Sequence, residues 1–538
     1  MAGLATSFGS GAMTNSIDEV AGAKCILLIG SNIATSHPII ELEVKKAVRN
    51  GAKLIIVNPR KIDTASWAYK WLRLRPGSDV ALLNAMAHVI LKEGLENKAF
   101  IQERTEDFEQ VKAIVEKVDL DEASKITGVS VEDITEAARI YATSEPSTIL
   151  YTLGITEHTH GTENVWAVAN LAMLTGQIGK PSSGVNPLRG ANNVQGVCDV
   201  GCLPEFLPGY QNPADVAAVA RLEREWGSEV PGKVGLTMVE MFHAALAGKV
   251  KAMYIVGENP ALSEPDAGHV DKALKDLEFL VVQDIFMTET ARHADVVLPG
   301  ASFAEKDGTF TNTERRIQRV RKAINPVGNS RPDWLITCQI AQAMGARGFD
   351  FGSASDIMDE IAKVVPQYGG VSYARLEGNG LQWPCPTPDH PGTGFLHKDK
   401  FSRGLGKFKP VEHRGPAEVP DKEFPLVLTT GRSRYHFHTG TMTRRVRGLD
   451  WLHSEELVEV SPEDASSLDI ADGDMVKVAS RRGEVTARAR VSNRCQKGVI
   501  FMTFHFWESS ANVLTNPAMD PVCKTPELKV AAVRLAKA

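Results

Sequence analysis

The chain has 538 residues, 43% of them hydrophobic, and a formal net charge of −6. That length predicts three or four domains with ordinary packed cores. The acidic and basic residues are interspersed, which argues against binding to nucleic acid or to a membrane surface through a basic patch. No apolar run is long enough for a transmembrane helix, and the first residues lack the basic and apolar regions of a signal peptide.

The first predicted βαβ unit surrounds the turn at residues 30–38, GSNIATSHP. An apolar run, CILLI (25–29), precedes the turn, as expected for a strand buried on both faces. Ser36 fits an N-cap, and Pro38 fits the first turn of a helix expected at 39–50. A second buried strand, KLIIV (53–57), follows and ends at Asn58.

The same pattern recurs at residues 257–265, GENPALSEP, with Gly, Asn, Ala, Ser and Pro at the same offsets. The flanking strands are AMYIV (252–256) and FLVV (279–282), and Ser263 and Pro265 fit the cap and first turn of the intervening helix. The crevice at the strand ends of such units can accept a phosphate. Neither turn reads GxGxxG, so a standard NAD site is not supported, and two ligand-free βαβ units remain an alternative.

These patterns predict an α/β chain with two Rossmann-like dinucleotide-binding domains, at residues 1–190 and 191–332. The first domain should also contain a strand at 147–153 and helices at 79–94 and 163–176. Residues 333–423 are expected to form a linker and irregular segment, because glycine, proline and aromatic residues dominate from 366 to 420. In residues 424–538, the expected strands FPLVLTT, DMVKVAS, EVTARARV and GVIFMTF, with an RRG hairpin turn, predict a small β-barrel.

The seven cysteines are scattered and form neither a disulfide framework nor a CxxC cluster motif. Cys198 and Cys202 lie close enough in sequence to supply half of a zinc site. No second pair lies nearby, so we favour free thiols.

The loop GKPSSGVNPLRGANNVQG (179–196) gathers glycine, asparagine, serine and proline around one arginine, Arg189. Solvated surface turns use the same residues. Arg189, however, lies between the two predicted α/β domains, where ligand clefts form. A planar guanidinium there could hold a carboxylate through two hydrogen bonds.

This loop and its neighbours resemble the catalytic (alpha) subunit of molybdenum- or tungsten-dependent formate dehydrogenases, in the molybdopterin oxidoreductase (DMSO reductase) family. The matching segments cover essentially the whole chain: SHPII, NGAKLIIVNPRKIDTA, ALLNAMAHVI, LAMLTGQIGKP, QDIFMTETA, ADVVLP, TGRSRYHFHTGTMT and KTPELKVAAVRL. The resemblance implies a barrel of the double-psi type and two molybdopterin guanine dinucleotides (bis-MGD) around one molybdenum or tungsten ion. The repeated turn would then be a pair of nucleotide cradles.

In the first cradle, the resemblance assigns diphosphate contacts to Gly30, Asn32 and Ser36. It assigns the ribose and guanine end to Asn58, Pro59, Arg60, Gly77 and Asp79, and a strand end beside the pterin to Gly154, Thr156 and Glu157. The family often has Asp at position 58 and Gln at position 157, so a buried carboxylate at Glu157 would be unusual.

In the second cradle, the resemblance assigns contacts to Gly257, Glu258, Asn259, Gln283 and Asp284, with Asp333 as the guanine partner. In the barrel it assigns cofactor contacts to Arg432, Ser433, His436, His438, Asn512 and Lys529. His436 and His438 could instead form a metal pair, because alternate strand residues share a face, although no third ligand is evident. For each residue, a turn or cap role without ligand contact is the alternative.

Arg189 is the catalytic residue that the resemblance implies. In the family, this arginine lies beside the metal and orients formate, whose oxidation gives CO2 and two electrons. The cofactor carries the redox chemistry, and the protein positions and polarises the substrate. No residue of this chain is expected to ligate the metal.

The family has further segments before the point at which this sequence begins, MAGLATSFGSGAM. They hold a [4Fe-4S] cluster, an electron-relaying lysine and the cysteine or selenocysteine that ligates the metal. We therefore expect a chain truncated at its N-terminus and inactive alone, because an in-frame UGA selenocysteine codon was read as a stop. A cloning or assembly error is the rival hypothesis, and the DNA upstream of Met1 distinguishes the two.

Two other functions stay open: another molybdopterin oxidoreductase, such as a nitrate reductase, and a non-catalytic electron-transfer scaffold that has lost the metal. By resemblance, the partners are formate or CO2 and electron-transfer subunits linked to iron–sulfur proteins, NAD, ferredoxin or a hydrogenase. Nucleic acid and a membrane span are not expected. A cytoplasmic location is expected, although an export signal could lie upstream of Met1.

Overall fold

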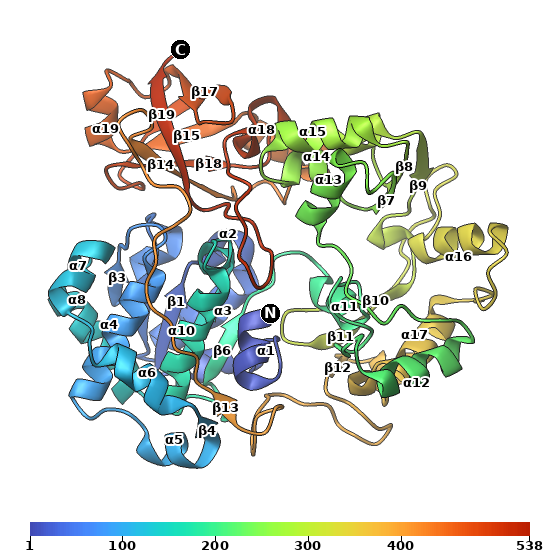
Figure 1. The fold of residues 1–538 in the computed structure, drawn as a ribbon, viewed down its shortest axis with the longest axis horizontal. Coiled ribbons are helices and arrows are strands. Elements are labelled where there is room, and N and C mark those ends of the chain that lie inside the picture. Colours follow the sequence, from blue (N-terminus) through green and yellow to red (C-terminus); the bar gives the residue numbers. More distant parts are fainter. The chain divides into compact units, whose positions relative to one another are not determined.

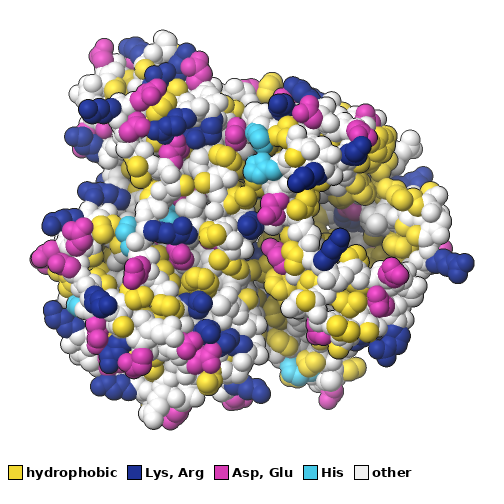
Figure 2. Space-filling view, viewed as in Figure 1, with side chains coloured by type: hydrophobic (Ala, Val, Ile, Leu, Met, Phe, Trp, Pro, Cys, Tyr) yellow, Lys and Arg dark blue, Asp and Glu magenta, His cyan; other side chains and the backbone are white.

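The computed structural model describes residues 1–538, and packing divides them into two compact units. Unit 1 comprises residues 1–190, 263–267 and 395–538, and unit 2 comprises residues 191–262 and 268–394. Acidic and basic side chains are mixed over the visible surface (Figure 2), as the composition predicts. None of the helices combines the length and the hydrophobicity that crossing a bilayer requires.

A parallel sheet in the order β3-β2-β1-β5-β6 forms the centre of the first part of unit 1. Its strands are β1 (Cys25–Ile29), β2 (Lys53–Val57), β3 (Lys70–Leu72), β5 (Ser147–Tyr151) and β6 (Gly184–Pro187). Leu27 and Ile29 pack into a core with helices α4 (Asp79–Lys92), α8 (Val131–Thr143) and α10 (Gly161–Leu174). Ile26 and Leu28 pack into a second core with α3 (Pro38–Arg49). Every position of β1 is therefore buried, which explains its unbroken apolar run. The strands and helices predicted for this part of the chain are present in the structure.

Shorter elements complete this part of unit 1 (Figure 1). They are α1 (Ala2–Phe8), α2 (Ile33–Ser36), β4 (Thr105–Glu106), α5 (Lys98–Arg104), α6 (Phe108–Val115), α7 (Leu120–Thr127) and α9 (Leu153–Thr156).

The predicted serine N-caps are wrong in both copies of the repeated turn. Ser36 ends the one-turn helix α2, and His37 occupies the position before α3, with Pro38 as the first helical residue, as predicted. Ser263 likewise ends α14 (Pro260–Ser263), and α15 (Ala267–Asp276) begins after Pro265. The extra helical turn forms because the Ser36 N–H donates to the Asn32 carbonyl at 3.0 Å, which continues the helix through the expected cap.

Unit 2 contains the second copy of the strand–turn–helix pattern. Strands β7 (Ala252–Val256), β8 (Phe279–Asp284) and β9 (Val296–Pro299) form a parallel sheet in that order. The remaining elements are α11 (Val194–Asp199), α12 (Val216–Trp226), α13 (Met238–Leu246), β10 (Gly308–Thr311), β11 (Arg316–Val320), α16 (Asp333–Ala343), α17 (Ala354–Val364) and β12 (Leu381–Gln382). Helices α16 and α17 occupy the start of the segment expected to be irregular. Only the glycine- and proline-rich stretch after them lacks long elements.

The predicted barrel is confirmed as a closed barrel with the strand order β14-β18-β15-β17-β16-β19. The strands are β14 (Leu426–Gly431), β15 (Leu457–Val460), β16 (Met475–Ala479), β17 (Glu484–Val491), β18 (Val499–Thr503) and β19 (Ala531–Lys537), with helices α18 (Arg447–Leu452) and α19 (Pro462–Ser467) between them. The pairs β14–β18 and β15–β17 are parallel, and the RRG turn joins β16 to β17 as expected. Strands β15 and β19 were not anticipated.

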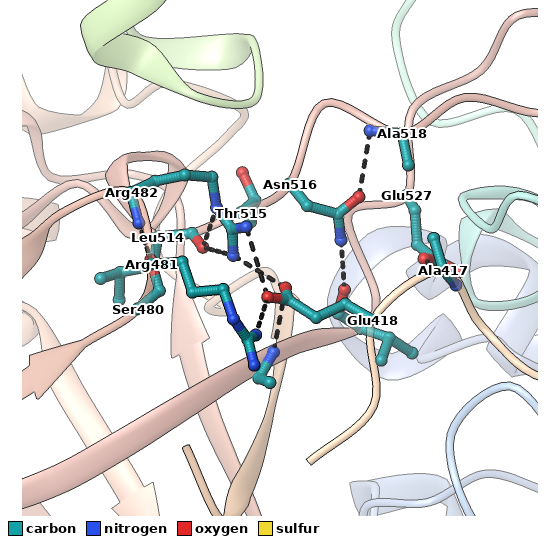
Figure 3. A network of polar contacts seen from close by, with 12 residues as sticks. Ala417, Glu418, Ser480, Arg481, Arg482, Leu514, Thr515, Asn516, Ala518 and Glu527 are labelled. Carbon is teal, nitrogen blue, oxygen red and sulfur yellow. Dashed lines mark hydrogen bonds and ion pairs between the residues drawn. The ribbon is translucent and has the colours of Figure 1, made fainter. Parts of the chain in front are cut away.

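Residues 395–425 form a strap that connects the α/β part of unit 1 to the barrel. Strand β13 (Gly406–Lys407) pairs with β4, and Asn84 donates to the Val411 carbonyl at 2.8 Å. Near the barrel, the Glu418 carboxylate accepts hydrogen bonds from Arg481, from Arg482 at 2.8 Å and from the Ala532 N–H (Figure 3). The strap is thus anchored to both parts that it joins.

The barrel core also contains a buried carboxyl group, Glu456. Burial raises the pKa of Glu456 from its ordinary 4.5 to about 8, against the hydrogen bonds that Thr503 donates to it. The folded chain therefore holds one proton more than the unfolded chain between these pH values. Because the unfolded state gains from losing that proton, this group lowers the free energy of unfolding by about 1.4 kcal/mol per pH unit as pH rises through the window.

We predict that Glu456→Gln removes this pH dependence, because the amide imitates the neutral carboxyl. The difference between the free energies of unfolding of E456Q and the wild type, measured by thermal or urea unfolding, should shift in favour of E456Q between pH 5 and pH 8. Glu455→Gln, at the exposed neighbouring position, should track the wild type. A constant difference between E456Q and the wild type across that range would contradict the prediction.

Candidate functional site

The turn after β1 is shaped by a glycine that no other residue can replace. Gly30 has φ of +56°, and a Cβ there would lie 2.7 Å from Ile155 Cγ2 and 2.8 Å from the Gly154 carbonyl carbon. The Gly30 N–H donates to the Val57 carbonyl at 3.0 Å, and the Gly30 carbonyl accepts from Thr152 Oγ1 and Gly154 N. These contacts fold the turn tightly against the ends of β2 and β5 and leave a cleft in front of it.

This first cleft lies within unit 1, between the carboxyl ends of the strands and the barrel, and its empty space, including the part open to solvent, is about 1010 Å³. The predicted site residues that line it are Gly30, Asn32, Ser36, Asn58, Pro59, Arg60, Gly77, Asp79, Gly154, Arg432 and Lys529. All residues assigned to the diphosphate and to the ribose and guanine end are in this list, as is Gly154, whereas Thr156 and Glu157 are not. The structure therefore brings together residues from six separate segments of the sequence.

Several polar atoms of the cleft-lining residues lack hydrogen-bond partners, and two of them lie next to Gly30. Ser31 Oγ and Asn32 Oδ1 are buried and unpaired, and both residues line the cleft. An unmade hydrogen bond of this kind costs about 1–3 kcal/mol, so such groups are expected where a ligand completes them. The Ser31 hydroxyl can donate to a diphosphate oxygen, and so can the N–H groups of the Asn32 amide, whereas Asn32 Oδ1 can only accept from a donor on the ligand.

Acceptors collect elsewhere in the same cleft. Asp79 is the first residue of α4 and is buried, which raises the pKa of its carboxyl to about 6, while the charge of His158 acts in the opposite direction. Asn58 is also buried and accepts from the Arg60 N–H at 3.1 Å. Carboxyl and amide oxygens of this kind can accept the N–H groups of a purine such as guanine.

Arg60 lines the cleft, but its charge is already paired. Its guanidinium donates two hydrogen bonds of 2.6 Å to Glu459 of β15 and stacks over the Phe501 ring at 4.1 Å. The pair is almost fully buried, so it joins the barrel to the α/β part of unit 1. The predicted ligand role of Arg60 is thus limited to the parts of the side chain and backbone that face the cleft.

Cations from the barrel complete the opposite wall. Lys529 Nζ lies 2.6 Å from Glu157 Oε2 and donates to the Thr430 carbonyl at 3.2 Å. Burial lowers the pKa of the Arg432 guanidinium, and the Glu157 charge opposes that shift. Two cations and one carboxylate therefore share this wall, which leaves one net positive charge for an anionic ligand. The unusual carboxylate at Glu157 is explained by its pairing with Lys529.

Other predicted barrel residues lie outside the cleft lining. His436 is buried, with its ring nitrogens at 3.2 Å from Thr443 Oγ1 and 2.6 Å from the His453 carbonyl. The Ser433 N–H donates to His505 Nε2, and the His438 carbonyl contacts His505 Nδ1. Asn512 is buried and donates to the Ser263 carbonyl at 2.9 Å. Ser433, His436 and His438 thus shape the barrel loop that carries Arg432.

Arg189 is partly buried next to the cleft. Its carbonyl lies 2.8 Å from His37 Nε2, and the following residue, Gly190, lines the cleft. Burial raises the pKa of Tyr151, and the Arg189 charge opposes that rise. The loop that carries the predicted catalytic arginine therefore reaches the wall formed by the first cradle.

The second copy of the turn, in unit 2, repeats the backbone geometry of the first. Gly257 has φ of +63°, and its N–H donates to the Gln283 carbonyl at 2.8 Å, just as Gly30 does to Val57. Asn259 bonds to Glu289 and Thr290, and Asp284 accepts from the Ile285 N–H. Asp333 accepts from Gln283 Nε2 at 2.7 Å and pairs with Lys306, and Glu258 follows Gly257 in the turn. Gln283 and Asp333 are thus bonded directly to each other, whereas Asn259 and Asp284 make separate contacts within unit 2.

Several lining residues were missed from the sequence, among them Ser31, His37, His158 and Phe501. Ser31 lies between two predicted residues, so its position alone could have indicated it. His37 occupies an offset at which the second copy has Glu264, so comparison of the two turns did not select it. His158 and Phe501 have no counterpart in the repeat.

Comparisons with known proteins agree with these features. Residues 3–343 match the family described as Molybdopterin oxidoreductase, and residues 426–532 match the Molydopterin dinucleotide binding domain. The F420-dependent formate dehydrogenase subunit alpha of Methanocaldococcus jannaschii is 52% identical over 99% of this chain and 79% of the relative. Formate dehydrogenase H of Escherichia coli is 42% identical over 99% of this chain and 76% of the relative.

The relatives also include a protein named for a different activity. The assimilatory nitrate reductase catalytic subunit of Bacillus subtilis is 38% identical over 97% of this chain and 76% of that protein. Among solved structures, acetylene hydratase from Pelobacter acetylenicus has a TM-score of 0.77 at 22% identity, covering 100% of this chain and 80% of that chain. This last likeness shows a shared fold.

We predict that Gly30→Val displaces the turn that forms part of the wall of the first cleft, because the new side chain would collide with Ile155 and the Gly154 backbone. The purified variant should contain far less pterin than the wild type, as measured by fluorescence of the oxidised pterin. Gly268→Val is the matched control, because a Cβ at Gly268 meets open space. Normal pterin content in G30V would mean that this cleft does not hold the ligand.

Proposed function

The chain belongs to the molybdopterin oxidoreductase family, and we propose that it acts as a formate dehydrogenase catalytic subunit that interconverts formate and carbon dioxide. The observation that carries this proposal is the position of Arg189, whose carbonyl contacts His37 in the wall of the first cleft. Relatives with up to 52% identity that are named formate dehydrogenases support the same substrate.

The first cleft suits one half of a bis-molybdopterin guanine dinucleotide. The Ser31 hydroxyl and the N–H groups of the Asn32 amide can donate to the diphosphate, and Lys529 with Arg432 adds positive charge. Asn58 and Asp79 offer acceptors to the guanine. Gly257, Gln283 and Asp333 would hold the second half. When bound, the cofactor with its molybdenum or tungsten supplies the two-electron chemistry.

Arg189 would bind the formate carboxylate. A guanidinium presents two parallel N–H donors that match two carboxylate oxygens, so it fixes both the position and the orientation of the substrate. With the oxygens held, the C–H bond points away from the guanidinium, toward the redox centre. The positive charge also attracts the formate anion from solvent. A neutral substrate would gain nothing from this attraction.

The electrons would leave through partner subunits. The relatives named as subunit alpha include F420-dependent enzymes, which suggests a cytoplasmic complex with an F420-, NAD- or ferredoxin-linked electron-transfer subunit. The [4Fe-4S] cluster and the cysteine or selenocysteine ligand stay predictions from the family resemblance.

Nitrate reduction is the second candidate, because a nitrate reductase matches nearly the whole chain. Nitrate is also a planar anion with oxygens that a guanidinium can hold, so Arg189 alone does not discriminate. Formate-dependent reduction of a viologen dye, compared with nitrate-dependent oxidation of the reduced dye, separates the two functions. Activity with nitrate and none with formate would exclude the main proposal.

We predict that Arg189→Ala in the holoenzyme lowers kcat/KM for formate on the order of 10³-fold, because a bidentate charged contact is lost. Metal and pterin content should stay at the wild-type level. Arg139→Ala is the control, since it removes another bidentate arginine–carboxylate pair, at an exposed position. If metal and activity fell together, Arg189 would belong to the cofactor-binding residues and not to the substrate site.

A further inference from the structure

His37 occupies a rigid position at the wall of the first cleft. Its backbone N–H donates to the Ile33 carbonyl at 2.8 Å, and its carbonyl accepts from the Glu41 N–H at 3.0 Å. The residue is therefore held by both helices that it joins, α2 and α3. Its imidazole extends from this fixed point, not from a mobile loop.

The imidazole is hydrogen-bonded to the loop that carries Arg189. Nε2 lies 2.8 Å from the Arg189 carbonyl oxygen, and a carbonyl only accepts, so Nε2 must carry the hydrogen. Burial lowers the pKa of His37 and Arg432 adds to that effect, while the bond to Arg189 opposes it. The other ring nitrogen, Nδ1, is buried without a hydrogen-bond partner. The His37 side chain is thus held by one hydrogen bond, which Nε2 donates to the Arg189 carbonyl. We call this bond the tether.

A second contact acts on the next residue of the loop. A Cβ at Gly190 would lie 2.9 Å from Arg432 Nη2 and 3.1 Å from Nη1, so the Gly190 backbone is already packed against that guanidinium. Arg432 in turn lies over the Phe437 ring at 5.5 Å. The Arg189–Gly190 backbone is therefore contacted by His37 from the α/β part and by Arg432 from the barrel.

We propose that His37 is a positioning residue, which fixes the Arg189 backbone to the wall of the dinucleotide cleft so that the Arg189 guanidinium is aimed from a rigid support. The role in substrate binding rests on the proposed function of Arg189, whereas the tether itself does not. The second copy of the turn has Glu264 at this offset, so the tether is an addition to the repeated scaffold and not part of it.

Two variants separate the hydrogen bond from the bulk of the side chain. His37→Gln keeps an N–H donor that can reach a carbonyl, whereas His37→Ala removes it. In the holoenzyme, H37A should lower kcat/KM for formate by about 10- to 100-fold, because a misplaced substrate ligand costs that much. H37Q should retain most of the wild-type value. His88→Ala is the matched control, because it removes another ring-to-carbonyl hydrogen bond, of 2.9 Å to Val115, that does not line the cleft.

A second readout does not depend on activity. Trypsin cleaves after arginine, and the Arg189–Gly190 bond can enter the protease only when its backbone leaves the wall. Limited trypsinolysis of the folded holoenzyme, followed by mass spectrometry, should show faster cleavage after Arg189 in H37A than in the wild type, H37Q or H88A. Pterin and metal content should be the same in all four proteins.

The outcomes separate the two proposals. Faster cleavage in H37A supports the tether even if formate proves not to be the substrate. In that case only the prediction for R189A fails. Unchanged cleavage and unchanged kcat/KM in H37A would overturn the tether. Loss of pterin in H37A would also overturn it, because His37 would then hold the cofactor. Failure of H37Q to restore both properties would exclude the Nε2 hydrogen bond as the cause.

Discussion

The first cleft depends on a backbone corner that only glycine can form. At Gly30, a positive φ and the contact with Gly154 and Ile155 exclude any side chain, so the chain turns sharply at the end of β1. That corner leaves Ser31 and Asn32 facing the cleft with unmade hydrogen bonds. Gly257 makes the same backbone bond to the neighbouring strand in unit 2. A small backbone constraint, used twice, therefore creates the polar surfaces that the proposed cofactor requires.

The charges around the first cleft are arranged to suit a nucleotide with unlike ends. Lys529 and Arg432 outweigh Glu157 on the barrel wall, whereas Asn58 and Asp79 offer acceptor oxygens. Burying these groups is costly, since Asp79 is desolvated enough to shift its pKa to about 6. The buried Arg60–Glu459 pair then joins the two walls. Binding, not stability, explains why so many polar groups are gathered in one place.

Much of this arrangement was predictable from the sequence, because it depends on local patterns. Apolar runs identified β1, β2, β7 and β8, and the repeated turn located both glycine corners. The predictions that proved wrong, and the contacts that were missed, depend on distant or competing interactions. Ser36 was expected to cap a helix that in fact begins after an extra turn, and the partner of Arg60 lies in a strand, β15, that was not anticipated. The His37–Arg189 bond links an element of the repeat to a loop far along the chain, which no periodicity reveals.

Unit 1 is discontinuous, because residues 191–262 and 268–394 of unit 2 are inserted between its two main segments. The glycine corner is synthesised early, whereas the barrel wall with Arg432 and Lys529 is synthesised only after unit 2. The nascent chain must therefore carry an open half-site, with its unpaired polar atoms in water, until the barrel closes over it. Such long-range closure is slow compared with local folding. A bulky ligand that enters during this interval would not have to pass the barrel wall.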